Sequence, residues 1–371
     1  KTFAMLARGE TMGTFQLGGS GMTKWLRELR PNRVEDIMIM IALFRPGPMA
    51  NIPEYIARKN KSKQVNYIHP KMATFLDKSY GILVYQEDIM FTAIELAGYT
   101  WETVDALRKA IGKKLPKEMA QQHEVFVQGC VKHSHMTEAE AEVIWELFVP
   151  FQGYGFNKAH AASYGIISYQ TSYMKANYPV EYMTALLTAE SGNTEKIVEA
   201  IDECKRVKIR VLPPNVNTSH TGFTIEEDPT SLDGRAIRFG LSAIKNVGNI
   251  AIEIILSARA AGPFTSLTDF CLRVDGQKVN RKVLESLIKS GCMDSFGNRS
   301  AMLGALDKIR GLGVSINKLK SQGQFSLFGG SDEIDTTDKL PTMPEFEKSQ
   351  KLSLEKELLG FYLSDHPLHA H

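Results

Sequence analysis

Apolar residues recur at helical spacing along most of the first part of the chain, and polar or capping residues interrupt them at regular intervals. We expect Ser20, Thr100 and Thr194 to cap helices, and Thr137 with Glu140 to form a capping box. Acidic residues early in several of these segments suit the helix dipole. The predicted helices are 2–8, 22–29, 34–44, one that ends at 96, one that follows Thr100, 116–131, 137–148, 164–176, 179–189 and 194–207.

The pattern changes after Pro213-Pro214-Asn215. Residues 223–225 and 236–239 have the short apolar character of strands, and a polar turn over 227–234 separates them. A helix over 249–259 follows. We therefore predict a mainly α fold, with a multi-helix domain over 1–212, a small α+β domain over 213–360 and a lead into further structure over 361–371.

Glycines and aromatic residues alternate in Phe151-Gln152-Gly153-Tyr154-Gly155-Phe156, just before a predicted helix. Glycine lets another molecule approach the backbone, and aromatic rings offer stacking faces. Asn157, Lys158 and His160 then place donors where free helix N–H groups already favour an anion. This segment alone fits a nucleotide site and a glycine-rich turn in a core about equally well.

A second candidate lies at the end of the helix that follows Thr100, where four cations fall within seven positions: Arg108, Lys109, Lys113 and Lys114. If the helix continues through Gly112, Lys109 lies one turn from Lys113. Such a cluster suits a triphosphate or a DNA backbone. The alternative is a charged helix end that interacts with its own carbonyls.

The second half carries two glycine-containing turns between helices. The segment Lys245-Asn246-Val247-Gly248 precedes a helix N-terminus, whose backbone N–H groups can hold a DNA phosphate without reading bases. A looser version runs from Val279 through Asn280 and Arg281 to Gly291. The pair resembles tandem helix-hairpin-helix elements.

From Gly311 onward the pattern predicts a looser chain. Within it, apolar side chains follow a glutamine in a polar, glycine-bearing context: Gln324, Phe325, Ser326, Leu327 and Phe328. This arrangement is typical of a peptide that docks into a partner's pocket, although a loop on its own domain would look similar.

Composition limits the classes of function. The formal net charge is only +2, so nucleic-acid binding has to come from local patches. The cysteines have no metal-ligand spacing and are interpreted as reduced, buried residues of a cytosolic protein: Cys130, Cys204, Cys271 and Cys292. No apolar run predicts a membrane span, and both ends are interpreted as cuts in a longer polypeptide.

The chain also contains adjacent acidic residues of the kind that can hold metal ions. The two pairs Glu35-Asp36 and Glu87-Asp88 lie on ordinary predicted helices, and we expect them to be helix-end or surface charges. No phosphate-binding loop of the type GxxxxGK[ST], and no strand-linked GxGxxG, is present, which weighs against an unrelated nucleotide-binding enzyme.

Taken together, these segments resemble the bacterial replicative DNA polymerase III alpha subunit, the C family of DNA polymerases. The segments that carry the resemblance occur in the family's order and cover nearly the whole chain: 44–48, 80–87, 107–114, 153–160, 168–171, 212–214 and 357–363. The resemblance implies a fingers domain up to about residue 212. It also implies a clamp-binding domain with tandem helix-hairpin-helix elements to about 360, and then a lead into an oligonucleotide-binding fold.

The resemblance also implies roles for the candidate residues. Arg108 and Lys109, with Lys113 and Lys114, would hold the incoming nucleotide's triphosphate. Tyr154, Asn157, Lys158 and His160 would face the nascent base pair. Lys109 and Ala159 stand where the family often has arginine and serine, so the residue after Lys158 supplies no hydroxyl here. The segments 245–248 and 280–281 would bind duplex DNA, and 324–328 would dock on the sliding clamp.

For the whole enzyme, the resemblance implies template-directed DNA synthesis in the bacterial cytoplasm, at the nucleoid. Primer-template DNA, nucleotide, clamp and other replisome subunits would be its partners, with no membrane. The family uses two Mg²⁺ ions on palm carboxylates, which we expect outside this chain, so the chain alone should not polymerise. A competing hypothesis is a pure tether that binds DNA and clamp, with the helical part as a scaffold.

Overall fold

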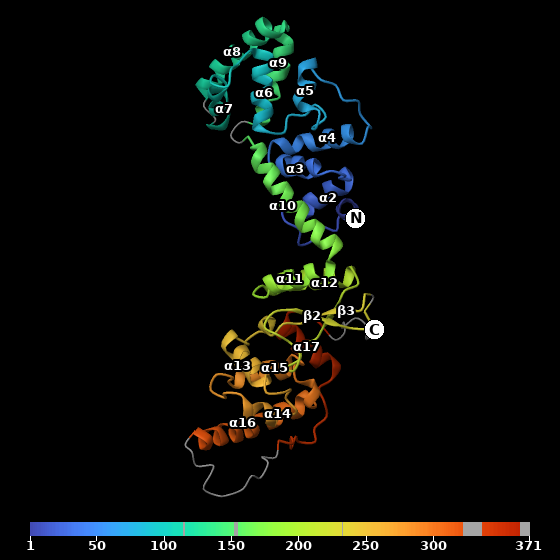
Figure 1. The fold of residues 1–371 in the computed structure, drawn as a ribbon, viewed down its shortest axis with the longest axis vertical. Helices are drawn as coiled ribbons and strands as arrows, with labels where there is room; N and C mark the ends of the chain where they lie inside the picture. Colours follow the sequence, from blue (N-terminus) through green and yellow to red (C-terminus); the bar gives the residue numbers. More distant parts are fainter. Residues whose placement is uncertain (114–115, 152–154, 232, 322–335, 364–371) are drawn as a thin grey trace. The chain divides into compact units, whose positions relative to one another are not determined.

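The computed structural model describes residues 1–113, 116–151, 155–231, 233–321 and 336–363. The chain forms two compact units, Lys1–Tyr178 and Pro179–His371 (Figure 1). Helices dominate both units, and one small sheet lies in the second. The predicted fold class, mainly α with a small α+β part, is confirmed.

The first unit contains one helical group built around the long helix α10. This group consists of α1 (Thr2–Ala7), α2 (Ser20–Leu29), α3 (Val34–Leu43), α4 (Ile52–Lys59) and α10 (Lys158–Asn177). α10 packs along α3 and also contacts α1. Gly165 permits the close approach, because a Cβ there would lie 2.4 Å from the Met38 side chain. Short 3-10 turns link the helices at 48–51 and 70–72.

A second helical group in the same unit has its own apolar core. It consists of α5 (Ala73–Leu76), α6 (Gln86–Ala97), α7 (Val104–Lys113), α8 (Pro116–Ser134) and α9 (Glu138–Glu146). α8 packs against α6, α7 and α9, and Gly129 lets it approach α6, since a Cβ there would meet the Ala97 carbonyl at 2.3 Å. The buried rings of Phe126, Trp145 and Phe148 pack against one another in tilted and edge-to-face contacts. The predicted capping box of Thr137 and Glu140 opens α9.

The second unit begins with two helices that pack on its sheet. α11 (Pro179–Ala189) contacts β2 (Thr224–Glu227) and β3 (Arg235–Arg238), and α12 (Thr194–Arg206) contacts β1 (Arg210–Leu212). The strand order is β1-β3-β2; β1 runs parallel to β3, and β2 runs antiparallel to it. The structural division thus lies before α11, whereas the sequence pattern placed the boundary at 212 and 213. The reason is that α11 and α12 bury their apolar faces against the strands that follow them.

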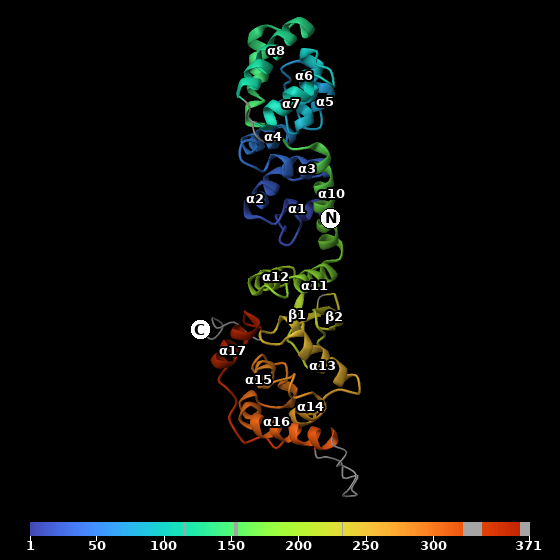
Figure 2. The same ribbon diagram turned by 90° about the vertical axis from the view of Figure 1, so that its left-hand side faces the viewer.

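The rest of the second unit is helical: α13 (Asn249–Arg259), α14 (Leu267–Arg273), α15 (Arg281–Lys289), α16 (Arg299–Ser321) and α17 (Lys348–Leu359). α16 packs against α14 and α15, as both views show (Figures 1 and 2). The expected loosening at Gly311 is wrong, because α16 continues through it to Ser321. Gly313 brings α16 against α14, where a Cβ would lie 2.5 Å from the Cys271 carbonyl.

A buried ion pair fixes α17 to the start of α16. The Arg299 guanidinium lies 2.8 Å from Asp294 and 3.3 Å from Glu355, and both Arg299 and Glu355 are almost fully buried. α17 ends at Gly360, which adopts a left-handed conformation with φ +89°. The four cysteines are buried thiols outside any disulfide, as expected. No helix in the described ranges is long and apolar enough to cross a membrane.

Candidate nucleotide and DNA contacts

The basic end of α7 forms one solvent-exposed face. Leu107, Ala110 and Ile111 are buried against neighbouring helices, whereas Lys109, Gly112 and Lys113 are exposed. No atom lies within 4 Å of the position that a Cβ on Gly112 would occupy. The predicted continuation of the helix through Gly112 is confirmed, while Lys114 lies outside the described residues.

The carboxylate of Asp105 pairs with the first two cations of this face, Arg108 and Lys109. The Arg108 guanidinium lies 2.6 Å from one oxygen of Asp105, and the Lys109 ammonium lies 2.8 Å from the other. Hydrogen bonds from Lys109 and then Arg108 hold the pKa of Asp105 below its usual value. The three groups are all at least one-third exposed, so an incoming anion can reach both cations.

The segment before α10 is fastened to the start of α6. The Gln86 backbone N–H donates to the Phe156 carbonyl at 2.9 Å. Glu87 accepts from the Asn157 side-chain amide at 2.8 Å and from the Lys158 backbone N–H at 2.9 Å. Asn157 in turn accepts from the His160 backbone N–H at 3.0 Å and is the N-cap of α10. Both polar atoms of its side chain therefore position the helix.

Two of the predicted stacking and approach features serve the chain's own packing. Phe156 is buried, and the Arg45 guanidinium lies 3.7 Å from its ring centroid. A Cβ on Gly155 would lie 3.0 Å from Gln86, so this glycine accommodates a neighbouring side chain of the same chain. The residues Gln152 to Tyr154 lie outside the described ranges, so the stacking role of Tyr154 stays a prediction.

Lys158 and His160 remain as exposed groups beside this junction. The Lys158 ammonium lies 5.6 Å from the centre of the Tyr85 ring, and the His160 ring lies 4.2 Å from Tyr164. The structure links α10 to α6 through Glu87, and α6 packs directly against α7. The two sequence-predicted clusters thus belong to one connected set of helices.

The two acidic pairs lie in the first turns of α3 and α6, in line with the expected helix-end charges, but two of the four carboxylates are not at the surface. Asp36 and Asp88 are buried, and each accepts hydrogen bonds at a helix start. Asp88 accepts from the backbone N–H groups of Val84 and Tyr85, both at 2.9 Å. Burial raises the pKa of Asp88 to about 6 against these hydrogen bonds. In the described ranges no group of three or more His, Cys, Asp or Glu residues is arranged to hold a metal ion.

The first predicted hairpin connects a short 3-10 turn, Leu241–Ala243, to α13. Asn246 has φ +70°, and its side-chain amide donates to the Ser286 hydroxyl on α15 at 3.1 Å. Val247 is buried, whereas Lys245 and Gly248 are exposed. Gly248 is the N-cap of α13, and no side chain caps this end of the helix. Asn246 thus anchors the hairpin to α15, whereas Lys245 and Gly248 face solvent.

The second predicted hairpin is more fully occupied by its own contacts. Asn280 is the N-cap of α15 and accepts from the Val283 backbone N–H at 3.1 Å. The Arg281 guanidinium lies 2.8 Å from Glu285 and 3.4 Å from Asp307. Arg281 is nevertheless more than half exposed, so these surface pairs leave it accessible.

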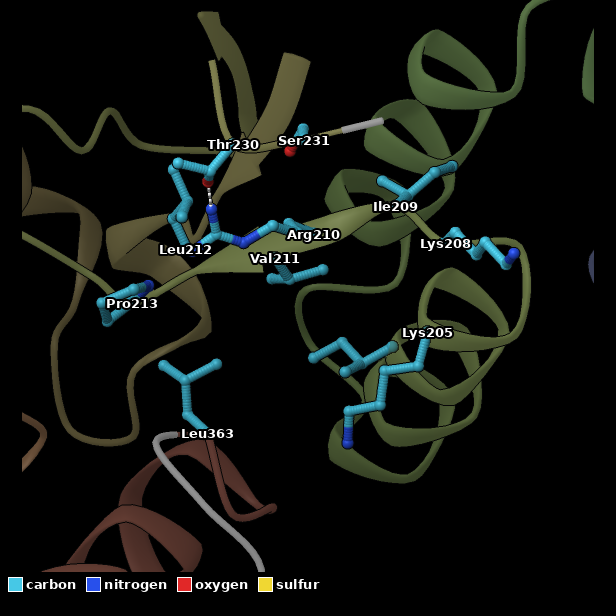
Figure 3. A pocket seen from close by; sticks show the side chains of 11 residues that line it. Lys205, Lys208, Ile209, Arg210, Val211, Leu212, Pro213, Thr230, Ser231 and Leu363 are labelled. Carbon is cyan, nitrogen blue, oxygen red and sulfur yellow. Dashed lines mark hydrogen bonds between the residues drawn. The ribbon is translucent and has the colours of Figure 1, made fainter. Parts of the chain in front are cut away.

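Two hollows among the described residues of the second unit bear on the candidate sites. One, of about 720 Å³, borders β1 and the turn that contains Thr230 and Ser231 (Figure 3). Its Arg210 is bonded to Thr230 and lies 2.6 Å from Asp228, so that cation is already paired. The other hollow, of about 590 Å³, includes all four residues of the first hairpin. The predicted clamp-docking residues 324–328 lie outside the described ranges.

Comparison with known proteins adds two family matches. Residues 1–134 match the bacterial DNA polymerase III alpha subunit finger domain, and residues 208–302 match a helix-hairpin-helix motif. The second match includes both predicted hairpins.

Relatives align with nearly the whole chain. DNA polymerase III subunit alpha of Thermus aquaticus is 42% identical over 99% of this chain and 30% of its own length. The subunits of Deinococcus radiodurans and Bacillus subtilis are 41% and 40% identical over the full chain. The chain spans 28 to 32% of the length of these three relatives.

Proposed function

The chain belongs to the bacterial DNA polymerase III alpha subunit family, and we propose that it supplies the nucleotide-contacting and duplex-contacting part of such a polymerase. In this proposal the first unit acts as fingers during template-directed DNA synthesis. The second unit binds the duplex and the sliding clamp. The basic face of α7, within the match to the finger domain, is the observation that carries the nucleotide role.

The chemistry of this face fits a triphosphate. Arg108 offers a planar set of donors, and Lys109 and Lys113 add point charges on the same exposed side of the helix. Asp105 holds Arg108 and Lys109 in place. A polyphosphate carries more negative charge than one carboxylate, so it competes effectively for both cations.

The start of α10 would then face the nascent base pair. Lys158 and His160 are the groups whose side chains are available there, and we assign Asn157 a positioning role through Glu87 and the helix cap. Tyr154 keeps its proposed stacking role as a prediction from sequence.

The open hairpin at Lys245–Gly248 is proposed to bind a backbone phosphate of duplex DNA, and Asn280 and Arg281 to support a second contact. The exposed N-terminus of α13 offers backbone N–H groups to an anion. Contacts of this kind read the backbone and not the base sequence, which suits a polymerase that travels along DNA.

We propose further that Gln324–Phe328 docks on the sliding clamp and that other replisome subunits bind elsewhere on the polymerase. The activity would take place in the cytoplasm, at the nucleoid. The Mg²⁺ ions of the reaction would be held by carboxylates that this chain does not provide.

The nucleotide role is tested in a full-length alpha subunit that carries this sequence. Arg108→Ala and Lys109→Ala each remove one charge-assisted contact, so we expect the KM for nucleotide to rise about tenfold or more in primer extension. The control is Lys132→Ala, which removes an exposed lysine of α8. An unchanged KM in the Arg108 and Lys109 variants would favour the tether hypothesis.

The clamp role is tested by the double change Leu327→Ala and Phe328→Ala. It should abolish binding to the clamp in a direct binding measurement, because the apolar anchors are removed. Binding to duplex DNA should remain and serves as the control. Retained clamp affinity would refute the docking assignment.

A further inference from the structure

The hollow beside the first hairpin is built from three separate segments of the second unit. They are the turn 191–194 before α12, the segment 242–248 that leads into α13, and the end of α17 at 356–360. Only the middle segment belongs to the helix-hairpin-helix match at 208–302. The other two segments therefore have no assigned role.

Contacts within the chain hold these segments against one another. The Lys245 backbone N–H donates to the Leu358 carbonyl at 2.9 Å, which joins the hairpin segment to α17. At Gly360 a Cβ would lie 2.0 Å from the Thr194 side chain, so α17 ends directly against α12. The Arg299–Glu355 pair fixes α17 from the other side. The hollow is therefore a preformed feature of the fold.

The charges around the hollow favour an anion. Lys245 and Lys356 are both exposed on its lining, and Glu357 is the one acid among the described residues that line it. The Lys356 ammonium lies 5.0 Å from the centre of the Tyr362 ring. This cation–π contact orients the lysine side chain without neutralising its positive charge.

The lining also suits a backbone phosphate better than a whole nucleotide. Gly192 and Gly248 have no atom within 4 Å of their would-be Cβ positions, so a ligand can approach the main chain closely at both. Ser191, Thr194 and Ser242 add hydroxyl donors. No described lining residue is aromatic, so a base would have no stacking face here.

We propose that this hollow seats a phosphodiester of the duplex backbone, with Lys356 of α17 and the Ser191–Gly192 turn as a second arm opposite the hairpin. The proposal rests on the duplex-binding role proposed for the hairpin. It extends the contact from one turn to a two-sided cradle in which α12, α13 and α17 all take part.

The test measures binding of the whole chain to a short DNA duplex as a function of salt. Lys356→Gln should weaken binding roughly fivefold to tenfold at about 0.1 M salt and lower the salt slope by about one, whatever the duplex sequence. Lys356→Arg should restore most of the affinity. The matched control is Lys208→Gln, an exposed lysine of the same unit that lines the other hollow, and its binding should equal that of the unmodified chain.

Lys245→Gln separates this inference from the function on which it rests. If Lys245→Gln weakens binding and Lys356→Gln does not, the hairpin function stands and the two-sided cradle is refuted. If the unmodified chain does not bind duplex, the proposed function itself fails. Equal weakening by Lys356→Gln and Lys208→Gln would show general charge attraction and refute the cradle. If inorganic phosphate displaces the duplex completely at constant ionic strength, the hollow is a site for free anions, and the proposed seat for a phosphodiester of the duplex is refuted.

Discussion

Asp36 is a carboxylate with no exposed surface, and neighbouring donors and cations compensate its buried charge. It accepts from the Arg33 guanidinium at 3.1 Å, from the Tyr55 hydroxyl at 2.8 Å and from the Asn32 backbone N–H at 3.0 Å. The Lys59 ammonium lies 3.5 Å away. Burial, and then the charge of Asp36, raise the pKa of Tyr55 above its usual range, so Tyr55 remains a donor.

Replacing this carboxylate should destabilise the first unit strongly. Asp36→Ala leaves the buried Tyr55 hydroxyl without its acceptor and removes the counter-charge of Arg33 and Lys59, and we expect a loss of about 3 to 5 kcal/mol in the free energy of unfolding. Denaturant titration measures it. Glu35→Ala, on the preceding and partly exposed residue, is the control and should cost less than about 1 kcal/mol. A similar loss of unfolding free energy in Asp36→Ala and Glu35→Ala would contradict the role of Asp36 as a buried acceptor.

Asp88 makes the stability depend on pH in a defined direction. Folding raises the pKa of Asp88 from 3.8 to about 6, so the protonated carboxyl favours the folded state at low pH. This stabilisation is lost as the pH rises from about 4 to above 6, where the buried carboxyl has to ionise. Asp88→Asn cannot ionise. The unfolding free energy of the variant should therefore improve relative to the unmodified chain by roughly 3 kcal/mol between pH 4 and 7.

Denaturant midpoints at several pH values check this prediction, with the exposed Asp77→Asn as control. A difference between Asp88→Asn and the unmodified chain that stays constant with pH would contradict it.

The sequence showed both acids, Asp36 and Asp88, at helix starts, but their burial depends on residues distant in the chain. Local pattern carries no such information.

At the scale of elements, local signals placed many helices well. Pro179 and Ala189 bound α11 as predicted, and α13 spans the predicted residues 249–259. Caps were less predictable: Gly19 and Asn193 stand at the N-cap positions expected for Ser20 and Thr194. Strand β1 was missed because it has three residues, and its pairing with β3 depends on chain far downstream.

The start of α10 shows how one element positions another, and it can be tested. Asn157→Asp keeps an acceptor for the His160 N–H but sets a carboxylate against Glu87. We expect it to lower the unfolding free energy by about 1 kcal/mol or more. In a Glu87→Gln background the same change should cost much less, because the repulsion is gone. Thermal unfolding of the four proteins of this cycle measures the coupling, and additive effects would contradict the contact.

At the scale of the whole molecule, the division at Tyr178 and Pro179 reflects where apolar surface is buried. Val180, Met183 and Leu187 of α11 are fully buried, as are Ile197, Ala200 and Ile201 of α12. The sequence pattern changes at residue 213 because Pro213 and Pro214 end strand β1 there, and this change was interpreted as a domain boundary. The sequence pattern showed the change from helices to strands but not which elements pack together.

This division predicts the behaviour of fragments. A fragment that begins at residue 179 should fold cooperatively, whereas one that begins at 213 loses α11, α12 and β1 and should expose the face of the sheet. Circular dichroism and calorimetry of the two fragments distinguish the outcomes. A well-folded fragment from 213 with unchanged melting temperature would show that α11 and α12 are dispensable, contrary to the packing described here.

The strand order β1-β3-β2 leaves β1 at an edge of the sheet, and an edge is a template on which other chains can assemble. Pro213 and Pro214 directly follow the strand, and proline cannot donate to a growing ladder. The prolines that mark the change of pattern in the sequence thus also end the strand at Leu212 and offer no N–H group to a further strand, so we expect this short edge to resist extension by a second copy.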